Sequence, residues 1–180
     1  MKVFMADKSV GKPKLDIPEE QYSFERKYIS CINNTDFMTM DYWVSSSGLS
    51  KNSELMLQMD IEGSEYYSII SMSDDLIKRF RIMVIEFHHL GNFWNKRFFS
   101  LAKMTFEKIL HTHICVHNHP NNYCGVETVG DIDIPQSTEF TFIRKDRVKT
   151  KTYERKFPHN LDRNNSSKSS LVLPRCWYKN

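Results

Sequence analysis

The sequence predicts an α/β protein in which helices pack on a mostly parallel sheet. Three short apolar runs, at 54–60, 81–87 and 113–117, alternate with two segments whose apolar residues recur at helical spacing, 66–80 and 95–110. A strand–helix–strand–helix–strand order favours parallel strands that are joined by crossover helices. Such crossovers are right-handed almost without exception.

Each element follows from a local pattern. The run ELMLQMD at 54–60 is nearly continuous in apolar residues, which is typical of a strand covered on both faces. The segment 66–80 has one polar interruption, Ser73, within its helical period. The segment 95–110 has an apolar stripe along one side, which is typical of a helix. In 137–146 apolar and polar residues alternate, which predicts a last strand at a sheet edge.

Three regions are expected along the chain. Residues 1–34 carry two prolines and no sustained period, which predicts an irregular segment. Residues 35–148 hold the α/β domain, beginning with a short strand or helical turn at 36–44. Residues 149–180 form a basic, polar tail, but its final LVLPRCWY includes Trp177 and Tyr178, which could fold back onto the domain.

Composition limits the class of protein. A chain of 180 residues with 40% hydrophobic and 26% charged residues is one ordinary globular domain. The net charge of +3 is too small to indicate nucleic-acid binding, although residues 144–163 hold eight Lys or Arg against three acids. We expect that run to be a solvated basic surface, with weak attraction to anionic partners as the alternative.

The location is predicted from what the sequence lacks. The four cysteines have no CxxC spacing, which indicates free thiols in a reducing compartment. The first residues turn polar too early for a secretory signal, and no apolar stretch is long enough for a membrane span. We therefore expect a cytoplasmic protein.

Ionisable side chains follow two strands of the predicted sheet. Asp60, Glu62 and Glu65 come after the first strand, and Glu86 and His88 end the second. Ligands of open α/β sheets bind outside the carboxyl ends of the strands. A carboxylate and an imidazole that meet there could remove a proton from a hydroxyl or hold a cation. The alternative is that the acids stabilise the start of the next helix.

A second group of ionisable residues lies in HTHICVHNHP at 111–120. Alternation along a strand would place five of these side chains on one face: His111, His113, Cys115, His117 and His119. Zinc or iron binding is therefore a hypothesis. Five ligands along one extended strand cannot all converge, so a polar strand end with hydrogen-bonded imidazoles is the alternative, and we assign no metal ligands.

Several segments resemble one family. MLQMDIEGSEYYSII resembles the D-x-E-G-x-E signature of FkbM-type S-adenosylmethionine-dependent methyltransferases, and RIMVIEFHHL is similar to the strand that follows it. DFMTMDYWV is similar to the segment before the signature. VHNHPNNYCG and PQSTEFTFIRKDR are similar to closing strands of one subgroup. The resemblance covers about residues 35–148.

The resemblance implies a Rossmann-like, class I methyltransferase sheet that moves a methyl group to a hydroxyl on a sugar or small metabolite. It implies Asp60, Glu86 and His88 as catalytic residues. It implies S-adenosyl-L-methionine as the cofactor, contacted by the turn that holds Asp60, Glu62, Gly63 and Glu65. The family's glycine-rich cofactor loop has no counterpart, since GxGxxG is absent, so the sheet is expected to be N-terminally truncated.

Two alternatives to an enzyme stay open. The domain could be a catalytically inactive or partial methyltransferase-like domain that acts as a binding module, or it could be a histidine-strand metal-binding protein. The expected partner is a small hydroxylated molecule, with no nucleic acid. A shortened sheet also predicts self-association through an exposed strand edge.

Overall fold

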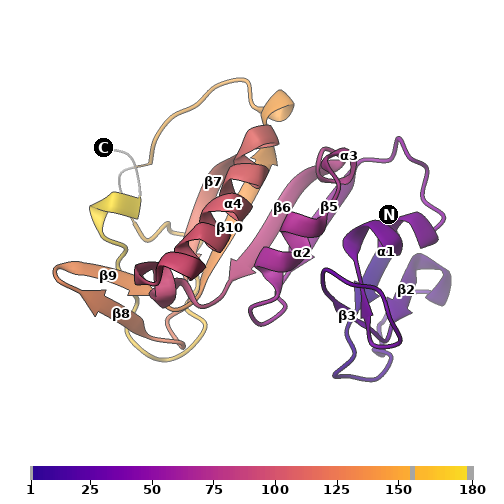
Figure 1. The fold of residues 1–180 in the computed structure, drawn as a ribbon, viewed down its shortest axis with the longest axis horizontal. Helices are drawn as coiled ribbons and strands as arrows, with labels where there is room; N and C mark the ends of the chain where they lie inside the picture. Colours follow the sequence, from indigo (N-terminus) through magenta and orange to yellow (C-terminus); the bar gives the residue numbers. More distant parts are fainter. Residues whose placement is uncertain (1, 155–156, 178–180) are drawn as a thin grey trace.

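The chain is built around one four-stranded sheet (Figure 1). The computed structural model describes residues 2–154 and 157–177. The strand order is β5 (Leu55–Met59), β6 (Phe80–Phe87), β10 (Thr138–Arg144) and β7 (His113–Pro120). β5 is parallel to β6, and β10 is antiparallel to both β6 and β7. Three of the four strands therefore share a direction in a mixed sheet, and the α/β class is confirmed.

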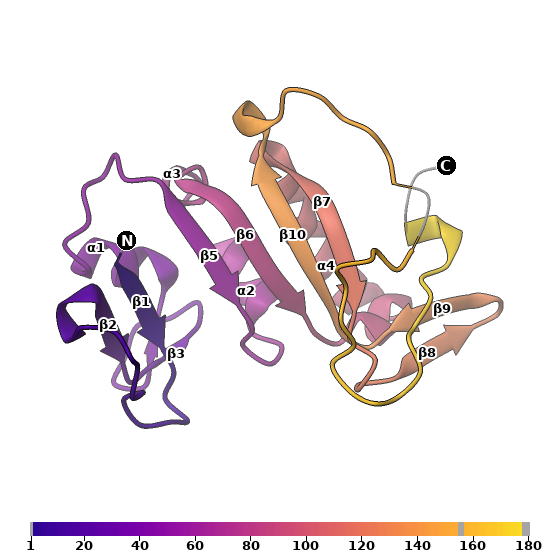
Figure 2. The ribbon, with the colours of Figure 1, turned by 180° about the vertical axis from the view of Figure 1, so that it is seen from behind.

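The helices α2 (Glu65–Ser71), α3 (Asp74–Ile77) and α4 (Lys96–Thr112) connect the parallel strands. Figures 1 and 2 show α2 and α4 on the same face of the sheet, where they pack against each other. Two right-handed crossovers that advance in one direction place their helices on one face. On the opposite face no helix is found among the described residues, and Met56 of β5 is 64% exposed there. The expectation that this strand is covered on both faces is wrong.

The predicted helix at 66–80 is broken at its polar interruption. Ser73 lies between α2 and α3, and its Oγ accepts a hydrogen bond from the N–H of Leu76 at 3.2 Å. The Ser73 N–H donates to Asp41 Oδ2 at 2.9 Å. Because serine satisfies helix-end groups so well, it begins a new helix here instead of continuing the old one.

The last strand does not lie at an edge. β10 is inserted between β6 and β7, and its Phe140 and Phe142 are buried. The edges are β5 and β7. Alternation alone shows that one face of a strand is buried, and it carries no information about how many neighbours the strand has. Self-association through the β5 edge stays a prediction.

The N-terminal segment contains regular structure where irregular chain was expected. Strand β1 (Val3–Ala6) pairs in parallel with β2 (Tyr22–Glu25), which follows the short 3₁₀ turn η1 (Glu19–Gln21). Strand β3 (Tyr28–Ile29) pairs in parallel with β4 (Phe37–Met38). Helix α1 (Met40–Ser46) follows β4, so segment 36–44 forms both a strand and a helix.

Aromatic rings join the sheet to α4. The ring of Phe87 lies 4.6 Å from Phe106 and 5.3 Å from Tyr66, between centroids. Buried Ala102 and Ile109 of α4 confirm the predicted apolar stripe. The remaining elements are η2 (Leu90–Trp94), the hairpin β8 (Val126–Val129) and β9 (Ile132–Pro135), η3 (Lys145–Arg147) and η4 (Arg175–Trp177).

The C-terminal tail returns to the domain on the β7 side of the sheet (Figure 2). Leu173 is buried, and the Trp177 ring lies 6.2 Å from Phe140. The predicted return of the tail is confirmed for Trp177, while Tyr178 lies outside the described residues. All four cysteines are free. Among the described residues, no helix has both the length and the apolar character needed to cross a membrane.

Candidate acid–base site

The ionisable residues that follow β5 and β6 lie together at the carboxyl ends of these two strands. Met59 pairs with Ile85, so Asp60 and Glu86 come next in each strand. His88 follows two residues later and lies beside the turn that leads into α2. The expectation that the strand ends meet at one edge is confirmed by this register.

His88 is held by a buried glutamate. Glu65 is the first residue of α2 and is fully buried. Its Oε1 accepts hydrogen bonds from the N–H groups of Ile61 at 3.0 Å and Gly63 at 3.1 Å. The same oxygen lies 3.0 Å from His88 Nδ1. Among the described residues, Oε2 of Glu65 has no hydrogen-bond partner. A carboxylate at Nδ1 fixes the orientation of the ring and leaves Nε2 able to exchange a proton or to bind a ligand.

The free nitrogen of His88 faces two more carboxylates. Nε2 lies 3.7 Å from Asp60 Oδ1 and 3.5 Å from Glu62 Oε2. The side chain of His88 is 12% exposed, whereas those of Asp60 and Glu62 are 51% and 86% exposed. One side of the imidazole is therefore anchored inside the protein, and the other side reaches the surface.

The surroundings shift three pKa values. The hydrogen bond with Glu65 raises the pKa of His88 above its ordinary value, and the charges of Glu65, Glu86 and Glu62 act in the same direction. Burial alone would raise the pKa of Glu65, but the hydrogen bonds from His88 and the backbone together hold it below its usual value. Burial and the charge of Glu86 raise the pKa of Asp60. The site therefore favours a charged Glu65–His88 pair.

A tight turn brings Glu62 beside His88. Glu62 and Gly63 have φ values of 55° and 103°, and His89 on the facing loop has φ 62°. A Cβ on Gly63 would lie 2.5 Å from His89 Nε2, so only glycine allows the two loops to come so close. Gly63 was expected to contact a cofactor, and in the structure it packs against His89. Left-handed conformations of residues other than glycine often occur at functional sites.

The helix-start alternative applies to one acid. Glu65 binds backbone N–H groups just before α2, as a helix-start carboxylate would. Neither Asp60 nor Glu62 has a hydrogen bond to the first turn of α2 among the described residues. Their carboxylates lie beside His88 Nε2 instead. Together with His88, they each offer one ligand atom within 4.8 Å of the others, so these three residues could hold a metal ion.

Glu86 belongs to a different contact group. Its Oε1 accepts hydrogen bonds from Asn121 Nδ2 at 2.8 Å and from the Ser137 hydroxyl. It acts on His88 and Asp60 through its charge and has no hydrogen bond to either. Glu86 instead lines a pocket with residues of β7, β10 and the tail.

The histidine segment does not present its five side chains on one face. His111 lies in α4, and buried His113 contacts the carbonyl oxygen of Phe80 through Nε2 at 2.7 Å. The register with β10 shifts by one residue between Cys115 and His117, which places these two on opposite faces. His117 and His119 face the tail, where both contact Asp162. A bulge cannot be read from alternation, and for this reason the one-face expectation is wrong.

The sequence reasoning missed the partners in the tail and in β10. Glu139, Asn121 and Asp162 line the pocket beside Glu86. The alternation of 137–146 could have placed Glu139 opposite the buried phenylalanines. No local signal connects Asp162 with a strand more than 40 residues earlier.

The chain matches no family model, no curated protein and no solved structure at a significant level. What the site can do is therefore argued from its own geometry.

Proposed function

We propose that the chain carries the acceptor side of an O-methyltransferase site, in which the Glu65–His88 pair removes the proton from a hydroxyl. One observation carries this proposal: buried Glu65 holds His88 at Nδ1, while Nε2 lies within 3.7 Å of the exposed carboxylates of Asp60 and Glu62. An imidazole that is oriented by a carboxylate is a general base for a hydroxyl. The D-x-E-G-x-E resemblance in the same turn supports methyl transfer as the reaction.

The described residues around this turn offer no cradle for S-adenosyl-L-methionine. Among the described residues, no strand leads into a glycine-rich loop that could hold the cofactor. Gly63 is packed against His89, and Glu65 is buried beneath His88. S-adenosyl-L-methionine would supply the methyl group. Our proposal assigns only the acceptor's side of the reaction to Asp60, Glu62 and the Glu65–His88 pair.

The proton would move along one defined path. The acceptor hydroxyl donates a hydrogen bond to His88 Nε2, and its proton passes to that nitrogen as the oxygen becomes the nucleophile. The Nδ1 proton stays on the imidazole, where Glu65 stabilises the imidazolium that forms. Asp60 and Glu62 lie close enough to Nε2 to stabilise the same charge. Because the pKa of His88 is raised, the base becomes free only as the pH rises above the ordinary histidine value of 6.5.

A binding module is the second candidate. The absence of a cofactor cradle among the described residues favours it, since the same edge could bind a hydroxylated molecule without any chemistry. The two functions differ in whether a methyl group appears on the ligand.

The test measures transfer of a labelled methyl group from S-adenosyl-L-methionine to a panel of sugars and small alcohols, with the full chain, between pH 6 and 9. The enzyme predicts transfer that increases with pH and is lost in His88→Gln, and the binding module predicts no transfer. His111→Gln, an exposed histidine on α4, is the matched control and should behave as wild type. Titration with S-adenosylhomocysteine shows whether the donor binds this chain. A folded chain that binds acceptors but transfers no label would contradict the enzyme and favour the binding module.

A further inference from the structure

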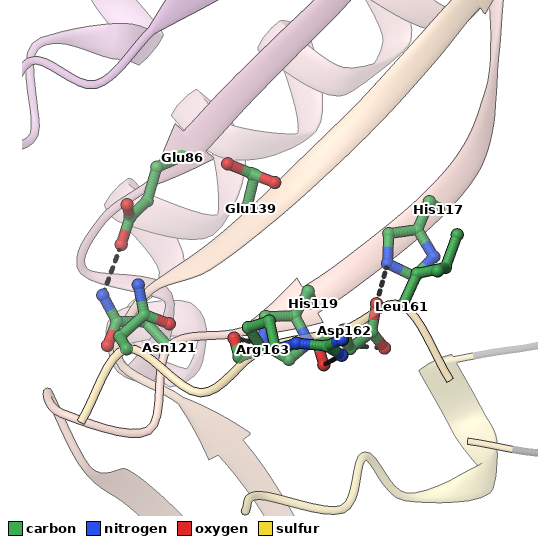
Figure 3. Close-up of a pocket in the computed structure, with 9 residues that line it drawn as sticks. Glu86, His117, His119, Asn121, Glu139, Leu161, Asp162 and Arg163 are labelled. Carbon is green, nitrogen blue, oxygen red and sulfur yellow. Dashed lines mark hydrogen bonds and ion pairs between the residues drawn. The ribbon is translucent and has the colours of Figure 1, made fainter. Parts of the chain in front are cut away.

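A polar pocket opens on the face of the sheet that has no helix (Figure 3). Its volume is about 270 Å³, which is near the lower end of ligand pockets at about 300 to 1,000 Å³. The strands β6, β10 and β7 form one wall, and the tail forms the other. The pocket is lined by Glu86, His117, His119, Asn121, Glu139, Leu161, Asp162, Arg163 and Asn165. Leucine is the single apolar side chain in that lining, so the pocket suits a polar ligand of about one ring.

Two glutamates leave the same face of the sheet in this pocket, and neither has an ion pair among the described residues. Glu139 of β10 is the register partner of Glu86 on β6, so both side chains lie on the same face. Glu86 receives hydrogen bonds from the uncharged groups of Asn121 and Ser137. Within residues 2–154 and 157–177, no hydrogen bond or ion pair to the Glu139 side chain is found. Like charges directly opposite each other destabilise a sheet, so this pair would gain from a bound positive charge.

The basic side chains of the pocket contact groups of the tail. His117 Nε2 lies 2.9 Å from Asp162 Oδ1, and His119 Nε2 lies 2.9 Å from the carbonyl oxygen of Arg163. The guanidinium of Arg163 donates to the carbonyl oxygens of Asn160 and Asp162. His119 Nδ1 is buried without a hydrogen bond and lies 3.5 Å from Asp162 Oδ2. None of these groups contacts the Glu139 carboxylate among the described residues. The Asn121 Nδ2 donates to Glu86, which leaves its second N–H for a ligand hydroxyl.

We propose that this pocket binds a small hydroxylated primary amine, such as an amino sugar. Its ammonium group would lie between Glu86 and Glu139, and one of its hydroxyls would contact the Asn121 amide. A metal ion is a poorer fit, because the one group of three converging metal-ligand atoms among the described residues is Asp60, Glu62 and His88.

The pocket adjoins the acid–base site. The charge of Glu86 contributes to the pKa shifts of both Asp60 and His88. The idea that the bound amine is the methyl acceptor rests on the proposed function. Its binding between the two glutamates is independent of that function.

The experiment is isothermal titration of the full chain with glucosamine, glucose and N-acetylglucosamine near neutral pH. These probes share a ring and hydroxyls, and they differ in whether a positive charge is present. We expect glucosamine to bind at least tenfold more tightly than the two neutral sugars. Glu139→Gln should remove that preference, whereas Glu127→Gln, which changes an exposed glutamate on β8, should keep it. Thermal melting of each variant confirms that it is folded.

The outcomes separate this proposal from the function above. Equal affinity for the three sugars, no binding of glucosamine, or an unchanged preference in Glu139→Gln would overturn the amine pocket. Glucosamine binding without any methyl transfer contradicts the enzyme and leaves the pocket supported. Transfer to neutral sugars with no preference for glucosamine does the reverse.

Discussion

Glu65 and Glu139 are two glutamates near the same end of one sheet, and the fold gives them opposite surroundings. Glu65 is fully buried and is the acceptor for two backbone N–H groups and His88. Glu139 is exposed and faces Glu86 with no donor from the described residues. A buried carboxylate must be satisfied by the protein itself, because its desolvation is costly. An exposed carboxylate stays accessible to a ligand. The first cluster is therefore preorganised, and the second is available for binding.

The strongest test of this contrast removes the buried carboxylate. Glu65→Ala leaves His88 and two backbone N–H groups without their acceptor, and we expect the free energy of unfolding to fall by about 3 to 5 kcal/mol. Urea denaturation measures the change. Glu62→Gln, at a side chain that is 86% exposed, is the control and should change it by less than about 0.5 kcal/mol. Equal effects of the two variants would mean that burial does not distinguish these acids.

The tight turn gives a second test. In Gly63→Ala the new Cβ meets His89 at 2.5 Å, and the backbone has φ 103°. Gly130→Ala has φ 65° and no atom within 4 Å, so it isolates the backbone term, which is about 1 to 2 kcal/mol. We expect Gly63→Ala to be more destabilising than the control by at least about 1 kcal/mol. A smaller difference would show that the two loops separate easily.

A third test follows the charge of the pair. Glu65→Gln removes the carboxylate that raises the pKa of His88, so NMR titration of the His88 ring should show a lower pKa than in wild type. The stability from His88 is complete below pH 6.5 and is lost as the pH rises through its folded pKa. The stability from Glu65 is complete above pH 4.5 and is lost as the pH falls through its folded pKa. The stability difference between wild type and Glu65→Gln should therefore be largest between these values.

The smallest effect is expected at the open pair. Glu139→Gln removes the repulsion with Glu86, which should raise the free energy of unfolding by about 0.2 to 1 kcal/mol. Thermal melting at low salt measures the gain, and added salt should reduce it because exposed charges are screened. Glu127→Gln should show no such gain. A destabilised Glu139→Gln would mean that this carboxylate already has a partner in the folded protein.

Local pattern predicted the four strands of the central sheet and the helical segments between its parallel strands. Near-continuous apolar runs gave β5 and β6, and the apolar stripe gave α4, because each pattern reflects which side of a single element is buried. The break at Ser73 was visible as a polar interruption in the sequence. The hydrogen bond from the Ser73 N–H to Asp41, which lies in a distant segment, was not. The place of β10 inside the sheet could not be predicted, because neighbours in a sheet depend on contacts between distant segments.

The sequence by itself determined that Asp60, Glu62, Glu86 and His88 would come to one edge, since parallel strands joined by helices end on the same side. Only the tertiary structure decided which of them touch. At the end of β6 the side chain of Glu86 accepts a hydrogen bond from Asn121, and the side chain of His88 contacts Glu65. One inserted residue in β7 turned His117 and His119 toward the tail, where Asp162 meets them. Contacts of this kind depend on geometry summed over the whole chain, which no short stretch of residues contains.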